Sequence, residues 1–320
     1  HINSVYESYH GGEWPPETTV SGTWTVDATT SPAIDAGDPG DTFGNEPVSG
    51  GRINQGAYGN TVQASKSAGI AWDGSTSSDW QDVTNWTPEQ IPTAVDEVVI
   101  PSACPNYPII DDGATTAVCN NLTIQSNASI EIAPNGQMTI SGSVTNNQGA
   151  NGFTIKSDAS GDGSLIANNA FEATVERFIT GDNWHLIFTP LSNVPTSVFT
   201  SEGAYTNYNF YSYFEPNEDY WSATDIYGTT GWTSEVATVT MPLDKGILFN
   251  RANYPDKTYV QSGGNLEINA KVFDVTYTVS TIPIENGVTQ GRVFFDGWNI
   301  AGNPYTSAID WDAVTLNGIE

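Results

Sequence analysis

The chain is rich in carboxylates, which could bind a metal ion directly, and three of them recur at a regular spacing. Asp35, Asp38 and Asp41 lie three residues apart in a loop rich in Gly and Pro. Flexible loops that supply several oxygen ligands suit Ca²⁺, so this segment is our candidate metal site, with Ca²⁺ as the cofactor. The spacing differs from that of an EF-hand, and the same acids could instead cap turns by accepting local N–H groups.

A dense run of aromatic residues between 205 and 221 could bind carbohydrate. Tyr and Trp side chains combine an apolar ring face with a polar tip, which suits stacking against a sugar. The candidate platform consists of Tyr211, Tyr213, Tyr220 and Trp221. A β-sandwich with few aliphatic residues also fills its core with aromatic rings, and this core interpretation is the favoured one.

The two cysteines of the chain, Cys104 and Cys119, predict a disulfide. A bridge that closes a loop of this length would stabilise the fold by about 3 kcal/mol on the chain-entropy model. Two free, buried thiols are the alternative. Because the sequence has no C-x-x-C motif, it supports neither a thioredoxin-like site nor a zinc knuckle.

No set of residues in the sequence has the pattern of a catalytic centre. A serine on the sharp turn Gly-x-Ser-x-Gly is missing, and His1, His10 and His185 belong to no catalytic motif. The Lys and Arg residues that a polysaccharide lyase would need are dispersed. A carboxylate pair for glycoside hydrolysis stays open, because a sequence does not give the distance between two acids. We therefore expect a protein that is not an enzyme, with lyase or hydrolase activity as the alternative.

The charge balance restricts the partners. The chain carries 9 Lys plus Arg against 37 Asp plus Glu, for a net charge of −28. Phosphate backbones and anionic membrane surfaces attract clustered Lys and Arg, so we expect neither nucleic acid nor a membrane as a partner. No apolar run is long enough to predict membrane insertion. Self-association, neighbouring surface proteins and polysaccharide remain as partners.

The pattern of apolar residues predicts an all-β protein. Short runs alternate apolar and polar residues and are separated by Gly, Asn, Asp and Pro, whereas sustained helical periodicity is missing. The segments 122–124, 130–132 and 138–140 each place apolar residues at i and i+2, so each buries one face. Their starts are eight residues apart, which fits either stacked coils or a meander.

Composition divides the chain into three regions. Residues 1–66 are mostly loop-like, and the small polar residues 61–70 indicate a linker. Residues 67–180 predict a Trp-rich β-solenoid or sandwich, and residues 181–320 predict a β-sandwich of jelly-roll type that is truncated at its end. His1 in place of Met leads us to expect a processed or trimmed chain.

Two motifs in the first region resemble the end of a right-handed parallel β-helix from a bacterial surface protein. The segment Ser31–Gly37 reads Ser-Pro-Ala-Ile-Asp-Ala-Gly, and Ile53–Tyr58 reads Ile-Asn-Gln-Gly-Ala-Tyr. The resemblance implies that residues 1–66 form the C-terminal end of a β-helix domain whose earlier coils lie upstream.

A wider set of motifs resembles large surface proteins of the Bacteroidetes that use the type IX secretion system. The set includes Trp72-x-Gly, Asp79-Trp80, Asn85-Trp86, Ile91-Pro-Thr, Trp184-His-Leu-Ile, Gly302-Asn-Pro and Ile309-Asp-Trp311. This resemblance implies an extracellular or cell-surface location and an adhesive or matrix-forming role. The C-terminal sorting domain of such proteins is not among these residues.

Together these features predict a structural or adhesive segment of a secreted or cell-surface bacterial protein, which could form fibres or a matrix. A carbohydrate-binding or carbohydrate-active β-helix protein is the alternative. Because the chain is so acidic, we expect divalent cations to promote assembly or stability.

Overall fold

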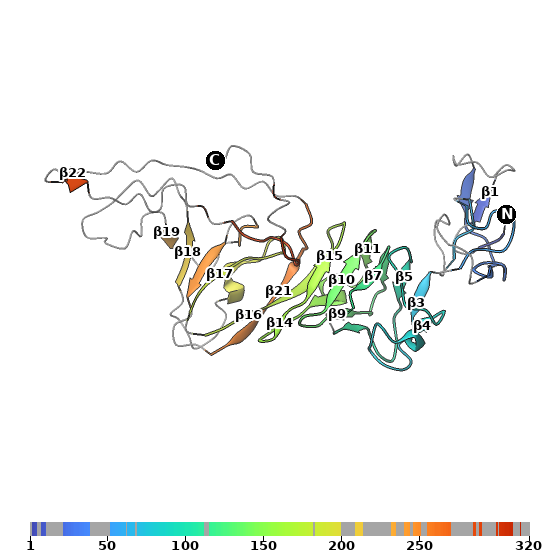
Figure 1. Cartoon of the computed structure of the whole chain (residues 1–320), viewed down its shortest axis with the longest axis horizontal. Coiled ribbons are helices and arrows are strands. Elements are labelled where there is room, and N and C mark those ends of the chain that lie inside the picture. Colours follow the sequence, from blue (N-terminus) through green and yellow to red (C-terminus); the bar gives the residue numbers. More distant parts are fainter. Residues whose placement is uncertain are drawn as a thin grey trace. The chain divides into compact units, whose positions relative to one another are not determined.

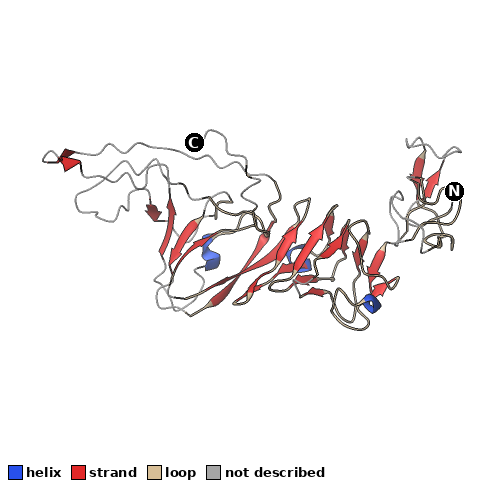
Figure 2. Cartoon of the chain, in the orientation of Figure 1, coloured by secondary structure: helices blue, strands red, loops and turns tan. Residues whose placement is uncertain are grey.

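The computed structural model describes most of the chain and divides it into two compact units. The first unit comprises residues 1–156 and 160–172, and the second comprises 157–159 and 173–320. Described residues are 2–4, 8–10, 22–38, 52–61, 63–67, 69–111, 115–181, 183–199, 209–213, 232–234, 240–243, 246–250, 255–269, 284–285, 288–289, 299, 301–309 and 314. Strands dominate them and helix is confined to single short turns (Figure 2), which confirms the all-β prediction.

The N-terminal residues form a small, loop-rich structure around one antiparallel pair, β1 (Ser8–His10) and β2 (Thr23–Thr25). The two motifs that resemble a β-helix end lie side by side, because the amide of Gly37 donates to the carbonyl of Ile53 at 2.8 Å. The linker prediction is wrong for part of its range. Ser65 is buried, its hydroxyl donates to the carbonyl of Ile2, and its own carbonyl accepts from Asn54.

A parallel β-solenoid of about three turns follows. Each coil contributes one strand to each of three parallel sheets, and Figure 1 shows the coils stacked along the chain. The first coil contains β5 (Val98–Ile100), β6 (Ile109–Ile110) and β7 (Ala117–Cys119). The second contains β8 (Leu122–Ile124), β9 (Ile130–Ile132) and β10 (Gln137–Ile140). The third contains β11 (Val144–Asn146), β12 (Phe153–Ile155) and β15 (Ser164–Ile166), with β13 (Ser157–Asp158) and β14 (Gly161–Asp162) paired between the last two.

The parallel register decides between the coil and the meander that the eight-residue spacing left open. Val98, Leu122 and Val144 are direct partners on one sheet, so the repeat is a coil of 22 to 24 residues. The three segments that start eight residues apart are the three sides of one coil. Their apolar residues at i and i+2 point inward and are buried, as the alternation predicts.

Three tryptophans fill the N-terminal end of the solenoid. Trp72 in β3 (Ile70–Trp72), Trp80 and Trp86 in β4 (Trp86–Thr87) are each at most 1% exposed. Their rings pack edge to face, with centroids 4.9 Å apart for Trp72 and Trp86 and 4.7 Å apart for Trp80 and Trp86. An open coil end would leave its apolar interior in water, so this cluster acts as a cap.

The loop of the cap is held by the short helix η1 (Val83–Asn85). The fully buried amide of Asn85 accepts from the backbone N–H groups of Thr76 and Ser77, at 3.0 and 2.9 Å. Its nitrogen donates to the Ser77 hydroxyl and to the carbonyl of Asp79, at 2.9 and 3.0 Å. One side chain therefore satisfies three backbone groups and one hydroxyl of this loop.

Amide side chains stack along one corner of the solenoid. Glu97 Oε1 accepts from the side chains of Asn120 and Asn121, both at 2.8 Å. Asn121 Oδ1 in turn accepts from the hydroxyl of Ser143 at 2.9 Å in the next coil. The side chain of Asn169 then accepts a hydrogen bond from the backbone N–H of Val144 and donates one to the Val144 carbonyl. This ladder holds successive coils in register where the chain turns.

The second unit consists of antiparallel strands. Its main sheet has the order β17-β20-β18-β19, with β17 (Trp184–Ile187), β20 (Ile247–Asn250), β18 (Asn209–Tyr213) and β19 (Trp232–Ser234). β16 (Glu172–Ile179) and β21 (Lys257–Asn265) are also neighbours, and β22 (Ile284–Glu285) pairs with β23 (Val288–Thr289). Phe199, Phe249 and Tyr259 form an aromatic core, with centroids 5.0 to 6.2 Å apart.

Candidate functional site

One face of the main sheet in the second unit presents large apolar side chains to solvent. Along β17, Ile187 is buried, whereas Trp184 and Leu186 are 52% and 44% exposed. On the neighbouring β20, Ile247 and Phe249 are buried. Alternate residues of a strand point to opposite faces, so the sheet has one face in the core and one outside.

The register brings the exposed residues into adjacent rows. Leu186 pairs with Leu248, which pairs with Tyr211 of β18, so these three lie side by side across the strands. The rings of Trp184 and Tyr211 have centroids 5.9 Å apart and are tilted by 41°. We call Trp184, Leu186, Leu248 and Tyr211 the aromatic face. A contiguous patch of this kind is a common feature of interaction sites.

The structure describes part of the predicted carbohydrate platform. Tyr211 is half-buried on the aromatic face, and Tyr213 follows it by two residues in β18, although its side chain lies outside the described residues. Tyr220 and Trp221 also lie outside them. The sequence pattern did not identify Trp184 as a residue of the predicted carbohydrate platform. Its alternation with Leu186 was visible in the sequence, but the two strands that bring Tyr211 beside it are not adjacent in the chain.

The predicted calcium residues are described only in part. Asp35 has a left-handed backbone with φ of 49°, and its amide donates to Asn54 Oδ1 at 2.8 Å. Asp38 is also described, whereas Asp41 lies outside the described residues. Across the described ranges, no three His, Cys, Asp or Glu side chains converge on a common metal position. Calcium binding stays a prediction.

The disulfide prediction is wrong in this structure, because both cysteines are free thiols. Cys119 points into the solenoid core from β7, where burial raises the pKa of its thiol to about 12, with smaller contributions from Glu97 and Asp96. Cys104 lies in the loop before β6, and its sulfur is 3.4 and 3.6 Å from two backbone carbonyls. Burial also raises the pKa of this thiol.

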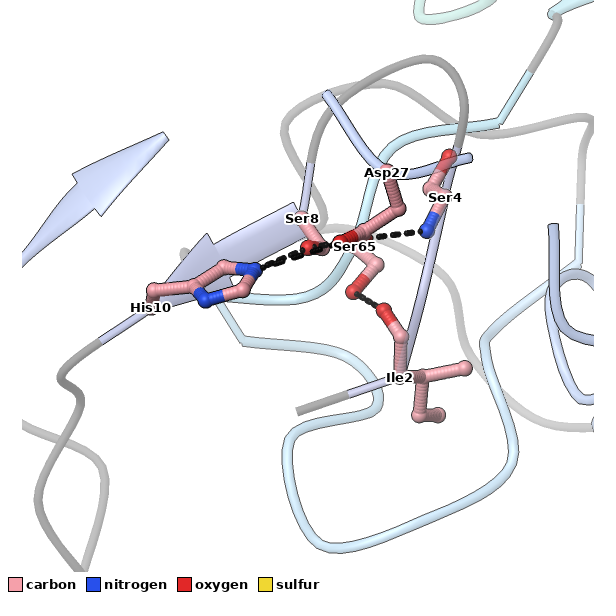
Figure 3. Close-up of polar contacts among 6 residues, drawn as sticks. All are labelled: Ile2, Ser4, Ser8, His10, Asp27 and Ser65. Atoms are coloured by element: carbon pink, nitrogen blue, oxygen red, sulfur yellow. Dashed lines mark hydrogen bonds and ion pairs between the residues drawn. The ribbon is translucent and has the colours of Figure 1, made fainter. Parts of the chain in front are cut away.

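A serine, a histidine and an aspartate meet at the N-terminal strand pair, which the sequence did not suggest (Figure 3). Ser8 and His10 share a face of β1 because they are two residues apart, and Asp27 follows β2 on the same side. The Ser8 hydroxyl donates to Asp27 Oδ2 and lies 2.8 Å from His10 Nε2. His10 Nε2 is also 3.5 Å from Asp27 Oδ1.

The arrangement of these three residues differs from that of a nucleophilic triad. The hydroxyl of Ser8 has one proton and donates it to Asp27, so its contact with His10 requires the imidazole to act as the donor. A histidine that acts as a general base must instead accept the proton of the serine hydroxyl on its ring nitrogen. Ser8 is fully buried, and Asp27 also accepts from the amide of Ser4 at 2.8 Å. The cluster therefore ties the strand pair to the preceding chain.

The fold and these surfaces define an all-β protein with a capped β-solenoid. A family model described as a domain of unknown function, DUF8693, matches residues 71–318, so the chain belongs to this family. Searches of curated proteins and of solved structures returned no match. In the described part of the chain, no helix has the length and apolar character needed to cross a membrane.

Proposed function

We propose that this chain is a non-catalytic structural or adhesive segment of a secreted or cell-surface bacterial protein. The exposed aromatic face of the main sheet is the observation that carries the proposal. Trp184 and Leu186 keep about half of their surface in contact with water, at 52% and 44% exposed, whereas Ile187, Ile247 and Phe249 on the other face of the sheet are buried. Burying such a face against a partner would contribute about 25 cal/mol for each Å² of apolar surface removed from water.

The solenoid supports the same proposal from another direction. Its coils repeat one backbone geometry, and its apolar residues are used for the internal core and the cap. A stacked coil of this type makes a stiff spacer that can carry other modules. The resemblance to Bacteroidetes surface proteins exported by the type IX system supports the proposal that such a spacer lies outside the cell, in a fibre or a matrix.

Self-association through the aromatic face is the form of this proposal that can be tested directly. At a net charge of −28, copies of the chain repel one another unless cations screen the charge. We therefore expect the purified 320-residue chain to assemble when Ca²⁺ is added and to return to monomers when the ion is chelated. Sedimentation velocity measures the size distribution, and cryo-electron microscopy shows whether the assemblies are ordered fibres.

Matched substitutions locate the contact. Trp184→Ser with Leu186→Ser should abolish assembly while leaving the thermal unfolding transition in place, because both side chains are exposed. Val260→Ser is the control, since Val260 is 54% exposed on β21 of the same unit. A chain that stays monomeric in every salt condition contradicts the proposal, and so does a double variant that assembles like the unmodified chain.

A carbohydrate-binding role is the second candidate, and the pair of Trp184 and Tyr211 favours it. The exposed ring of Trp184 and the half-buried ring of Tyr211, with centroids 5.9 Å apart, offer flat apolar surfaces beside polar tips. A glycan array with the intact chain and with Trp184→Ala tests this role. Binding that disappears in Trp184→Ala supports it, and an array without any binder rejects it.

A further inference from the structure

The two rings of the aromatic face come from strands that are not neighbours. In the sheet, β20 lies between β17, which carries Trp184, and β18, which carries Tyr211. Strands two positions apart in a sheet are separated by about 9–10 Å. The centroids of the two rings are only 5.9 Å apart. Both side chains therefore lean toward each other across β20, and they form one platform instead of two separate contacts.

The outer side of this platform is open to water. Trp184 and Leu186 are exposed and Tyr211 is half-buried. Leu186, Leu248 and Tyr211 occupy one row across three strands, so aliphatic side chains border the rings. The floor of the platform is apolar, and its polar groups are the indole N–H of Trp184 and the hydroxyl of Tyr211.

The two rings are not coplanar, because their planes are inclined by 41°. A crystalline polysaccharide presents its sugar rings in one flat layer, and such a layer stacks on only one of two inclined rings. A single glycan chain that twists along its length turns each sugar ring relative to the one before it. Neighbouring residues of that chain can therefore meet both aromatic faces. The inclination favours a twisted single chain over a crystal surface.

The four strands of this sheet contain no Lys, Arg, Asp or Glu. The whole chain carries a net charge of −28. A polyanion such as a polyuronate or a sulfated glycan would be repelled by this charge and would find no cation on these strands to pair with. A neutral glycan meets neither obstacle. Charge therefore selects a neutral ligand for the aromatic face.

We propose that the aromatic face binds a neutral, twisted glycan chain, with one sugar residue over Trp184 and the next over Tyr211. The ring spacing of 5.9 Å is close to the length of one sugar residue along such a chain. Sugar hydroxyls accept from the indole N–H, and they both donate to and accept from the tyrosine hydroxyl. This inference rests on the carbohydrate-binding role proposed above and adds its ligand class, which is a helical glucan or a similar neutral chain.

Isothermal titration calorimetry with the intact chain tests the site of two rings. The probes are glucose and its dimers and tetramers with α-1,4 or β-1,3 linkages. A dimer covers both rings and a monomer covers one, so we expect a dimer to bind about tenfold more tightly than glucose through the added apolar contact. Tyr211→Ala should remove this difference, whereas Tyr211→Phe keeps the ring and should preserve it.

Two further variants make the test independent of the folding of Tyr211→Ala. Trp184→Ala changes an exposed side chain and should also remove the difference between monomer and dimer. Val260→Ala alters an exposed residue of β21 in the same unit and should bind like the unmodified chain. A dimer that binds no better than glucose, or a Trp184→Ala variant that keeps the difference, would overturn the proposal.

Pull-down and competition experiments separate the ligand class from the carbohydrate-binding role itself. We expect the chain to pass through crystalline cellulose and to ignore polygalacturonate. Retention on cellulose, or binding of polygalacturonate as tight as that of the neutral tetramers, would overturn the ligand class and leave a carbohydrate-binding role in place. Binding of no glycan at all would reject that role as well. If sedimentation shows association of the chain that the tetramers do not reverse, a second copy occupies the face and the inference fails.

Discussion

Asn85 offers the sharpest test of how the solenoid cap is held together. Its amide makes four hydrogen bonds to Thr76, Ser77 and Asp79 of the cap loop. Asn85→Ala removes all four bonds and leaves the backbone N–H groups of Thr76 and Ser77 without their partner, whereas the carbonyl of Asp79 still accepts from the amide of Asp82 at 3.2 Å. The hydroxyl of Ser77 can rotate toward water, so the two backbone N–H groups carry most of the cost.

The expected loss follows from these two N–H groups. A buried polar group that loses its partner costs about 1–3 kcal/mol. Thr76 is exposed and Ser77 is partly exposed, so water replaces part of each lost bond and the lower half of the range applies to each group. We expect a destabilisation of about 2–4 kcal/mol for the cap and the coil beneath it. With an m-value of about 2 kcal/mol per molar urea, the unfolding midpoint falls by about 1–2 M.

Urea unfolding followed by tryptophan fluorescence measures this shift, because three buried tryptophans lie in the cap. Asn151→Ala is the matched control, since Asn151 is exposed in the same unit. Asn85→Asp should fall between the two. It keeps an acceptor for the two N–H groups but loses the donor and places a carboxylate beside the Asp79 carbonyl. A midpoint for Asn85→Ala no lower than that of Asn151→Ala would refute the reasoning.

Three further predictions concern thiols, pH and backbone geometry. In the native chain at pH 8, Ellman's reagent should react with Cys104 and spare Cys119, because the pKa of about 12 keeps the buried Cys119 thiol protonated. Both thiols should react in urea, and equal reactivity of the two thiols in the native chain would contradict the burial argument. Hydrogen bonds from the Ser8 hydroxyl and the Ser4 backbone N–H hold the pKa of Asp27 below its usual value. These bonds therefore contribute fully to the stability of the fold above the unfolded-state pKa of about 3.9, and their contribution is lost as the pH falls through the lower pKa of the folded state. A chemical-shift titration of Asp27 with a midpoint at or above the usual value would show that these bonds are not formed. Gly74→Ala should lower the urea unfolding midpoint, because φ of Gly74 is +57° and an added Cβ would lie 2.0 Å from the backbone oxygen of Asn106. An unchanged midpoint in the same urea experiment would contradict this close approach.

The inward faces of the solenoid strands could be predicted because alternation is a local property. Leu122 and Ile124 are separated by one polar residue, so they share one face of their strand, and both are buried. The same local pattern could not distinguish coils from a meander. Strands eight residues apart have identical alternation in both, and only the pairing of Leu122 with Val98 and Val144 reveals the longer repeat.

The candidate sites were less accessible to sequence reasoning because they depend on residues far apart in the chain. The disulfide prediction was wrong because the strand β7 directs Cys119 into the core, whereas Cys104 lies in a loop. The aromatic face needed β18 and β20 to bring Tyr211 and Leu248 beside Leu186. No spacing within one segment predicts such neighbours.

By itself, the sequence determined the all-β class and the buried positions of the solenoid strands, because both follow from short-range alternation and turn residues. It also determined the strong negative charge, which is a property of composition. The tertiary structure decided how the strands pair, that the thiols of Cys104 and Cys119 stay apart, and which apolar residues remain exposed. These depend on register between distant segments, where a shift of one residue moves every side chain to the opposite face of its sheet.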